Sequence, residues 1–167
     1  KDNDQSYKIR FANRIDMDTS GIVIVAKNAN SQNDISHQMR ANSVHKQYIA
    51  IVNGVIEDDE FTINEPIGRP SEESIQRTVL SEGGKDAITD VKVLERFKRN
   101  TLVEITLHTG RTHQIRVHLT HIGHPITGDH LYGGDAPELM ERQALHAAKM
   151  SLKHPMTGET LNIEAPL

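Results

Sequence analysis

The apolar residues of the chain come in short stretches separated by turn-forming residues, and this pattern constrains the fold more than any other feature. None of the stretches approaches the roughly 20 residues that a helix needs to span a bilayer. Several are rich in β-branched residues or alternate between apolar and polar positions, which is typical of strands. The 167 residues contain no cysteine, so neither a disulfide nor a thiolate metal site can hold the strands together. The sequence therefore predicts several short strands around one hydrophobic core.

Three segments carry the strand signal. Residues 21–26 form a continuous apolar, β-branched run between turn residues, which predicts a strand buried on both faces. Residues 45–52 alternate and end at Asn53-Gly54, as expected of a half-buried strand. The same period of two recurs at residues 91–93 and 103–107.

Two segments carry a helix signal instead. Residues 31–40 are polar except for Ile35 and Met39, which are spaced to lie on one side of a surface helix. Residues 111–122 change to a helical period, with apolar residues at 115, 119 and 122 and a glycine directly after them. We therefore predict a single α+β domain over residues 1–167, with a mixed, mostly antiparallel sheet and flanking helices.

The formal net charge of −4 argues against a uniformly basic nucleic-acid-binding surface. The charge is uneven, however. Residues 1–56 carry +2, residues 57–95 carry −7 and residues 96–167 carry +1. The acidic middle segment predicts hairpin tips and surface loops, so the charge argument does not exclude an RNA partner for the other two segments.

The ten histidines raise the question of a metal site, since eight of them lie between His108 and His154. No His-Glu-x-x-His or similar ligand motif is present, and we predict no metal. Residues 1–5 do not resemble a signal peptide. The lack of cysteine favours a reducing cytoplasm, and no membrane association is expected.

The first candidate site is the turn before the apolar run, residues 13–21, which contains Asp16 and Asp18. A carboxylate on such a turn can be held by the sheet and still face a cleft, as a nucleophile or a general acid or base requires. The alternative is an Asx turn, in which the carboxylate only binds nearby backbone amides.

The second candidate site is Gly110–His118, where a strand turns into a helix. Arg116 falls beside the apolar stripe of this helix. A guanidinium there needs a carboxylate partner, because an unpaired buried charge is costly. The alternative is an arginine whose stem covers apolar surface while its head reaches water. His113, near the helix N-terminus, is expected to stay neutral.

Taken together, five segments resemble, in order and spacing, the RluA/RluD-type RNA pseudouridine synthases. The likeness covers roughly residues 8 to 165, and a closing His-Pro-Met-Thr-Gly-Glu fits it too. The segments are Asn-Arg-Ile-Asp-Met-Asp-Thr-Ser-Gly (13–21), Lys-Gln-Tyr-Ile-Ala-Ile-Val-Asn-Gly (46–54), Gly-Arg-Thr-His-Gln-Ile-Arg-Val-His-Leu (110–119), His-Pro-Ile-Thr-Gly-Asp-His-Leu-Tyr-Gly (124–133) and Leu-His-Ala-Ala (145–148).

The resemblance implies an enzyme that isomerises uridine to pseudouridine in structured ribosomal or transfer RNA, without cofactor or metal. Asp16 matches the family's catalytic aspartate, and Arg116 matches the arginine that pairs with it. Tyr48 matches the tyrosine that packs on the target base and is a candidate for proton removal. Arg14 matches the residue that fills the gap left by the uridine. Such chemistry requires the base to be flipped out of its stack.

With this resemblance, Arg111 is expected to contact RNA, and His113 and Gln114 are expected to be structural or to contact RNA rather than to act as acid–base groups. Asn13 departs from the family's usual histidine, and a modest effect is expected because asparagine also donates and accepts hydrogen bonds. The chain starts close to the aspartate motif, so the family's N-terminal strand and turn and any S4-type RNA-binding domain are expected to be missing. We expect a monomer, with dimerisation through an exposed sheet edge as an alternative.

Two other functions compete with the synthase. One is an RNA-binding module without catalysis, which would follow if the N-terminal region is needed to complete the cleft. The other is a glycosidase-like enzyme that uses Asp16 with a second carboxyl group, about 5 to 9.5 Å away.

Overall fold

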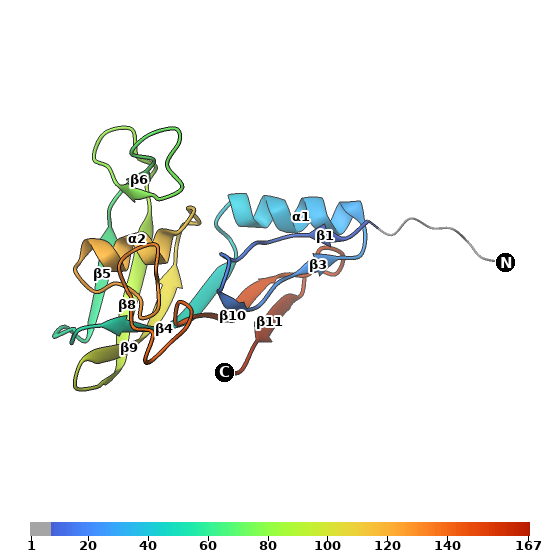
Figure 1. The fold of residues 1–167 in the computed structure, drawn as a ribbon. Helices are drawn as coiled ribbons and strands as arrows, with labels where there is room; N and C mark the ends of the chain where they lie inside the picture. The colour runs from blue at the N-terminus through green and yellow to red at the C-terminus, as the bar shows by residue number, and fades with distance from the viewer. Residues whose placement is uncertain (1–7) are drawn as a thin grey trace.

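The computed structural model describes residues 8–167 of the chain (Figure 1). Residues 1–5, where the sequence predicts no signal peptide, lie outside the described residues. Within residues 8–167, no helix has the length and apolar character needed to cross a membrane.

A seven-stranded sheet forms the centre of the molecule. Six strands follow one another in the order β11-β10-β4-β9-β8-β5, each antiparallel to its neighbour, and β2 pairs parallel with β10. This confirms the predicted mixed, mostly antiparallel sheet. The strands are β2 (Ser20–Gly21), β4 (His45–Asn53), β5 (Glu60–Asn64), β8 (Ile88–Arg96), β9 (Asn100–Leu107), β10 (Leu145–Lys153) and β11 (Thr160–Glu164).

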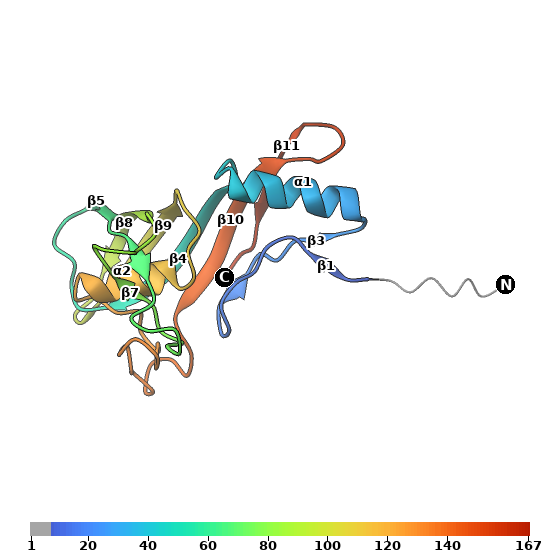
Figure 2. The same cartoon turned by 90° about the horizontal axis from the view of Figure 1, so that it is seen from above.

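Two small ribbons and two helices complete the described part of the chain. β1 (Arg10–Phe11) pairs with β3 (Val25–Ala26), and β6 (Ile67–Gly68) pairs with β7 (Thr78–Val79). The β6–β7 ribbon projects away from the sheet beyond α2 (Figure 1), and in the view from above it overlaps α2 (Figure 2). The helices are α1 (Ala29–Arg40) and α2 (Gln114–His121).

Both helices lie on one face of the sheet, above its two halves (Figure 1). The stripe predicted for α1 is confirmed, since Ile35 is buried against Met150 and Leu152 of β10 and Met39 packs on the same cluster. In α2, Ile115 and Leu119 are buried over the other half of the sheet, as predicted. The space between the helices therefore lies over the middle of the sheet, above β4.

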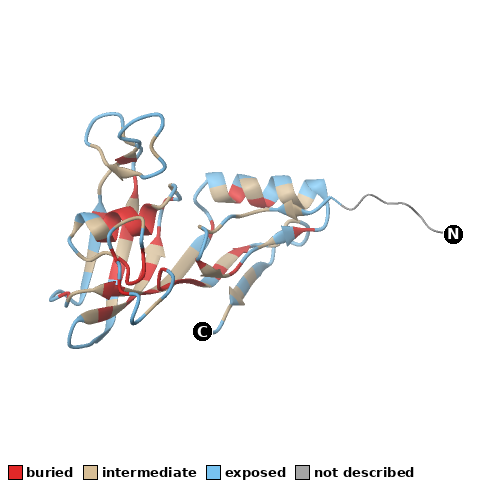
Figure 3. Ribbon diagram, in the orientation of Figure 1, coloured by how far each residue is buried: buried red, intermediate tan, exposed pale blue. Residues whose placement is uncertain are grey.

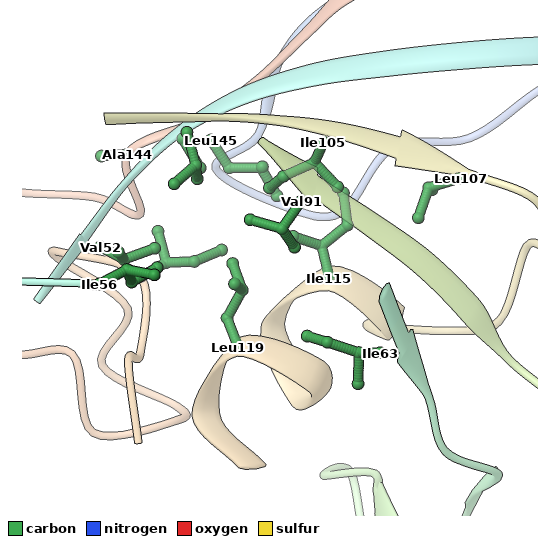
Figure 4. Packing of buried hydrophobic residues seen from close by; sticks show 13 residues of the cluster. Val52, Ile56, Ile63, Val91, Ile105, Leu107, Ile115, Leu119, Ala144 and Leu145 are labelled. Carbon is green, nitrogen blue, oxygen red and sulfur yellow. The ribbon is translucent and has the colours of Figure 1, made fainter. Parts of the chain in front are cut away.

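The main core lies between α2 and the sheet (Figures 3 and 4). Val91, Val103 and Ile105 point inward from β8 and β9 and are almost fully buried, as the period of two predicts. On β4, Ala50 and Val52 join the same cluster. These inward positions fix the register of β4 against its neighbours, because a slip of one residue would turn the apolar side chains outward.

The prediction for residues 21–26 is wrong in one respect. The run does not form one strand buried on both faces. It is split between β2 and β3, and Val23 and Val25 are exposed. The division follows from Gly21, whose φ of +113° is open to glycine but not to other residues. Gly21 turns the chain from its parallel pairing with β10 toward its antiparallel pairing with β1.

The second predicted helix begins three residues later than expected. Residues 111–113 precede α2, and His113 adopts a left-handed conformation with φ 57°. The side chain of Gln114 stabilises this turn, since its oxygen accepts hydrogen bonds from the Thr109 hydroxyl and the Arg111 amide, each at 2.9 Å. A local side-chain bond therefore replaces the first helical turn.

The acidic segment 57–95 differs in part from the prediction of hairpin tips and loops. It contains β5, β6, β7 and most of β8. Most of its acidic residues nevertheless lie in the connections between these strands, since only Glu60, Asp90 and Glu95 belong to β5 or β8.

Candidate active site

The side chain of Asn13 fixes one end of the turn that carries Asp16 by hydrogen bonds to the backbone. The Asn13 side chain donates a hydrogen bond to the Ile22 carbonyl at 3.1 Å and accepts one from the Ile24 amide at 2.7 Å. Asn13 thus bonds the backbone of the following segment as a neighbouring strand would. This use of both amide groups agrees with the expectation that asparagine can serve at this position.

The far end of the same turn is held by residues just before β10. The Gln143 side chain donates hydrogen bonds to the Met17 carbonyl at 3.1 Å and to the Thr19 hydroxyl. Arg142 donates to the Asp18 carbonyl at 3.0 Å. The turn itself is closed by the Asp16 carbonyl, which accepts from the Thr19 amide at 3.0 Å. The backbone oxygen closes the turn, so the Asx-turn alternative is not needed to explain Asp16.

The carboxylate of Asp16 faces Arg116. Arg116 Nη1 lies 3.3 Å from Asp16 Oδ2, and the guanidinium is buried while Asp16 keeps 18% of its side chain exposed. The sequence prediction that these two residues meet, one hundred positions apart, is confirmed. Arg116 therefore does not reach water as the alternative required.

Asp129, which sequence reasoning did not single out, is the stronger partner of Arg116. It accepts hydrogen bonds from Arg116 Nε at 2.7 Å and from Nη2 at 2.8 Å, and it is almost fully buried. Its Oδ1 also accepts from the backbone amides of Leu131 and Tyr132. Burial alone lowers the pKa of Arg116, but the hydrogen bonds and charges of Asp129 and Asp16 raise it overall.

Tyr48 lies on the same pocket wall, on β4. Burial, with a smaller contribution from the Asp16 charge, raises the pKa of its phenol to about 12. The hydroxyl therefore stays protonated at neutral pH. A protonated phenol can pack on a base and can donate a hydrogen bond. Removal of a proton from the substrate, the other role that the resemblance suggests, requires an ionised phenol.

His113 lies next to Asp16, with its Nε2 4.0 Å from Asp16 Oδ2. Burial is the main reason that the pKa of His113 is lowered, which agrees with the prediction of a neutral ring, although the prediction rested on the helix N-terminus. The Tyr132 hydroxyl accepts a hydrogen bond from the Arg77 amide and lies 2.9 Å from His113 Nδ1. Tyr132 can therefore donate to Nδ1, which leaves the ring proton on Nε2, toward Asp16.

These groups line a pocket of about 310 Å³ between α1, α2 and β4, a volume at the low end for ligand sites in proteins. The sequence-predicted residues Asp16, Tyr48, Arg116, Arg14, Arg111 and His113 all line it. Arg14 is exposed, and Arg111 donates to the Asp86 carbonyl at 2.8 Å. The other lining residues are Ala12, Asn13, Ile15, Thr19, Met39, Lys46, Leu107, Gly110, Thr112, Gln114, Ile115, Leu145 and Met150.

The pocket is basic although the chain is acidic. Its lining includes four basic side chains, Arg14, Lys46, Arg111 and Arg116, against one carboxylate, Asp16. A negative partner is therefore favoured at this site. Asp129 does not line the pocket, and both of its oxygens are bound to Arg116, so it is not placed to act as the second carboxylate of a glycosidase.

The histidines are dispersed through the structure. His118 and His146 bind backbone carbonyls and hydroxyls, and His124 lies 2.9 Å from the Asn53 carbonyl. Within residues 8–167, no three histidine or carboxylate side chains are grouped closely enough to hold a metal ion.

Fold and site together define a class, an α+β protein with one arginine-bound carboxylate in a basic pocket. Comparison with known proteins identifies the family. Residues 1–121 match the family model described as RNA pseudouridylate synthase. An uncharacterized RNA pseudouridine synthase of Bacillus subtilis, YhcT, is 44% identical over 166 residues, which cover 98% of this chain and 54% of that protein. The chain belongs to the RNA pseudouridylate synthase family, as the sequence motifs suggested.

Other relatives agree. Ribosomal large subunit pseudouridine synthase D of Neisseria meningitidis is 42% identical over 94% of this chain and 45% of its own length. Among solved structures, Human RNA Pseudouridylate Synthase Domain Containing 1 superposes with a TM-score of 0.83 at 31% identity and covers 95% of this chain and 69% of that one. The chain spans about half the length of the curated relatives it matches.

Proposed function

We propose that this protein isomerises a uridine in structured RNA to pseudouridine, with Asp16 as the catalytic carboxylate and without a cofactor. The observation that carries the proposal is the pairing of Asp16 with the buried Arg116 in a basic pocket. In the reaction the bond between N1 of the base and the sugar breaks, the base rotates, and C5 bonds to the sugar. The proton on C5 goes to solvent and N1 gains one, so the product is an isomer of the substrate.

The site residues predicted from the sequence each have a role in this proposal. Asp16 engages the target nucleoside so that the base can detach, and Arg116 orients the carboxylate. Tyr48 packs on the flipped base, and its protonated hydroxyl is a hydrogen-bond donor. Arg14, exposed at the pocket, occupies the gap that the uridine leaves in the RNA. Stacking and polar contacts of this kind offset the few kcal/mol that base flipping costs.

Arg111 and His113 are proposed to contact the RNA near the flipped nucleotide. Ribosomal RNA is the first substrate to test, since the Neisseria relative is named for the large ribosomal subunit, and transfer RNA is the second. The cytoplasmic location and the monomeric state expected from the sequence stay predictions.

The test is to map pseudouridines in the ribosomal and transfer RNA of a strain that lacks the gene. The proposal predicts the loss of pseudouridine at one or a few sites and its return when purified protein is added to RNA from that strain. An unchanged map would contradict it. Binding of the RNA without any new pseudouridine would instead favour the RNA-binding module without catalysis.

A further inference from the structure

We propose that Lys46 binds a phosphate group of the RNA backbone inside the active-site pocket. The inference rests on the proposed function for its ligand, and it adds a binding residue that neither the motifs nor the family comparison assigns.

Lys46 lies on the pocket side of β4. It precedes Tyr48 by two residues, and both line the pocket, since alternate residues of a strand point to the same face. Its partners on the neighbouring strands are Leu107 of β9 and Met150 of β10, which are both buried and apolar. The stem of Lys46 is therefore flanked by apolar side chains from both neighbouring strands, and the residue lines the same pocket as Asp16.

The amine has no counter-charge among the residues described. No carboxylate of residues 8–167 lies within 4.0 Å of it, and no hydrogen bond to it is formed there, whereas Lys92 and Lys149 pair with Glu60 and Glu164. Burial lowers the pKa of Lys46, with no opposing contribution from an acidic neighbour. Lys46 is half-buried, and partial burial of an ammonium without a partner is unfavourable, so the site favours an anionic ligand.

Gly110 lies beside this amine. A Cβ atom at position 110 would lie 3.3 Å from Lys46 Nζ and would meet no other atom within 4 Å. The φ angle of Gly110 is not in the left-handed region, so backbone conformation does not require glycine there. An added methyl group at position 110 would therefore displace the Lys46 amine by a few tenths of an ångström.

The ligand of this amine follows from the charges around it. The carboxylate in the pocket, Asp16, pairs with Arg116 and makes no contribution to the pKa of Lys46, so it does not serve as a close counter-charge for this amine. RNA carries one phosphate for every nucleotide. A nucleotide flipped into the pocket brings its own phosphates to the wall next to Tyr48, where an ammonium can bind them as a point charge.

The test is equilibrium binding of the full chain to a uridine-containing RNA hairpin between about 50 and 200 mM NaCl. Lys46→Met removes the charge and keeps an apolar stem of similar size. We expect about tenfold weaker binding, the loss typical of one charged hydrogen bond. We also expect a salt dependence that is shallower by about 0.7 to 0.9 in log K against log salt. Lys46→Arg should restore most of both.

Lys92→Met is the matched control. Lys92 follows the buried Val91 on β8, so it points away from α2 and the pocket. Its substitution should leave the affinity and the salt slope near those of the unchanged protein. If Lys46→Met weakens binding without changing the salt slope, the ligand is a neutral oxygen and the phosphate proposal is overturned. If Lys46→Met has no effect on binding, it is overturned as well.

A second variant tests the same contact without touching the lysine. Gly110→Ala should weaken RNA binding in the normal background and have no additional effect in the Lys46→Met background. Additive losses would contradict the proposed contact. All these measurements report RNA binding and not pseudouridine formation, so failure of the phosphate proposal can be distinguished from failure of the proposed activity. A protein that binds RNA through Lys46 but forms no pseudouridine would refute the activity and leave this inference standing.

Discussion

Arg116 is bound by Asp129 through two hydrogen bonds of 2.7 and 2.8 Å, and it reaches Asp16 at 3.3 Å with its remaining terminal nitrogen. The guanidinium therefore stands between a buried carboxylate that fixes it and a partly exposed one that faces the pocket. Asp129 decides the direction in which Nη1 points, and hence where the Asp16 carboxylate is held.

Replacing Asp129 should damage stability and turnover together. Asp129→Ala leaves the buried Arg116 with half of its compensation, which typically costs about 3 to 5 kcal/mol, so chemical denaturation should show a large loss. Asp129→Asn keeps the shape and some hydrogen bonds. We expect it to fold, with a lower kcat and a smaller change in KM, because the residue acts on the orientation of Arg116 and not on RNA binding.

Asp135→Asn is the control for this prediction, since Asp135 is exposed and, among residues 8–167, forms an ion pair only with the exposed His130. It should change neither stability nor kcat noticeably. A normal kcat in Asp129→Asn would show that Asp129 does not position the arginine.

Replacing Tyr48 with phenylalanine should distinguish the contribution of its ring from that of its hydroxyl. Phenylalanine keeps the apolar surface that packs on a base, so affinity for RNA should be retained. If the hydroxyl donates or transfers a proton in the reaction, kcat should fall about 100-fold or more. Single-turnover rates at saturating enzyme measure this directly, and an unchanged rate would restrict Tyr48 to packing.

The raised pKa of Tyr48 also predicts a stability change at alkaline pH. In the unfolded chain the phenol ionises near pH 10, but in the folded protein only near about 12. The stabilising contribution is therefore complete below pH 10 and is lost as the pH rises toward 12, by at most about 1.4 kcal/mol per pH unit. Tyr48→Phe should remove this part of the pH dependence from denaturation curves.

The buried side chain of His118 leads to a second prediction, a loss of folding stability at acidic pH. It is fully buried, and its ring nitrogens lie 2.8 Å from the Thr89 hydroxyl and 2.9 Å from the Glu65 carbonyl. Burial lowers its pKa from 6.5. As the pH falls through 6.5, the unfolded chain takes up a proton that the folded protein resists, so the free energy of unfolding decreases.

Denaturation at about pH 7.5 and about pH 5.5 measures this loss. His118→Gln should be less stable at both values but should lose less on acidification. His37→Gln, on the exposed face of α1, should behave like the unchanged protein. Equal losses in all three proteins would assign the acid sensitivity to other groups.

The sequence predicts the parts of the fold that depend on one local pattern. The alternation at residues 45–52 and 103–107 and the spacing of Ile35 and Met39 reflect which side chains face the core, and all these features are present in the structure. The run at residues 21–26 misleads because an apolar composition alone does not show that Gly21 turns the chain from one partner strand to another.

Only those site residues that belong to a recognisable family motif could be predicted from the sequence. Asp16 and Arg116 are one hundred positions apart, and no spacing rule joins them. The resemblance to a known family did. Asp129 lay within a quoted motif, but its role depends on a turn that folds its carboxylate under α2. Lys46 could have been found from its shared strand face with Tyr48, yet its missing counter-charge is visible only once β9 and β10 are in place.

The central claim is that Asp16 converts uridine to pseudouridine in RNA, and tritium release from RNA labelled at C5 of uridine tests it most directly. Each isomerisation replaces the C5 hydrogen, so the unchanged protein should release tritium. Asp16→Asn, which keeps the size of the side chain but removes the carboxylate, should bind the same RNA and release none above background. Release by Asp16→Asn at the rate of the unchanged protein would contradict the account.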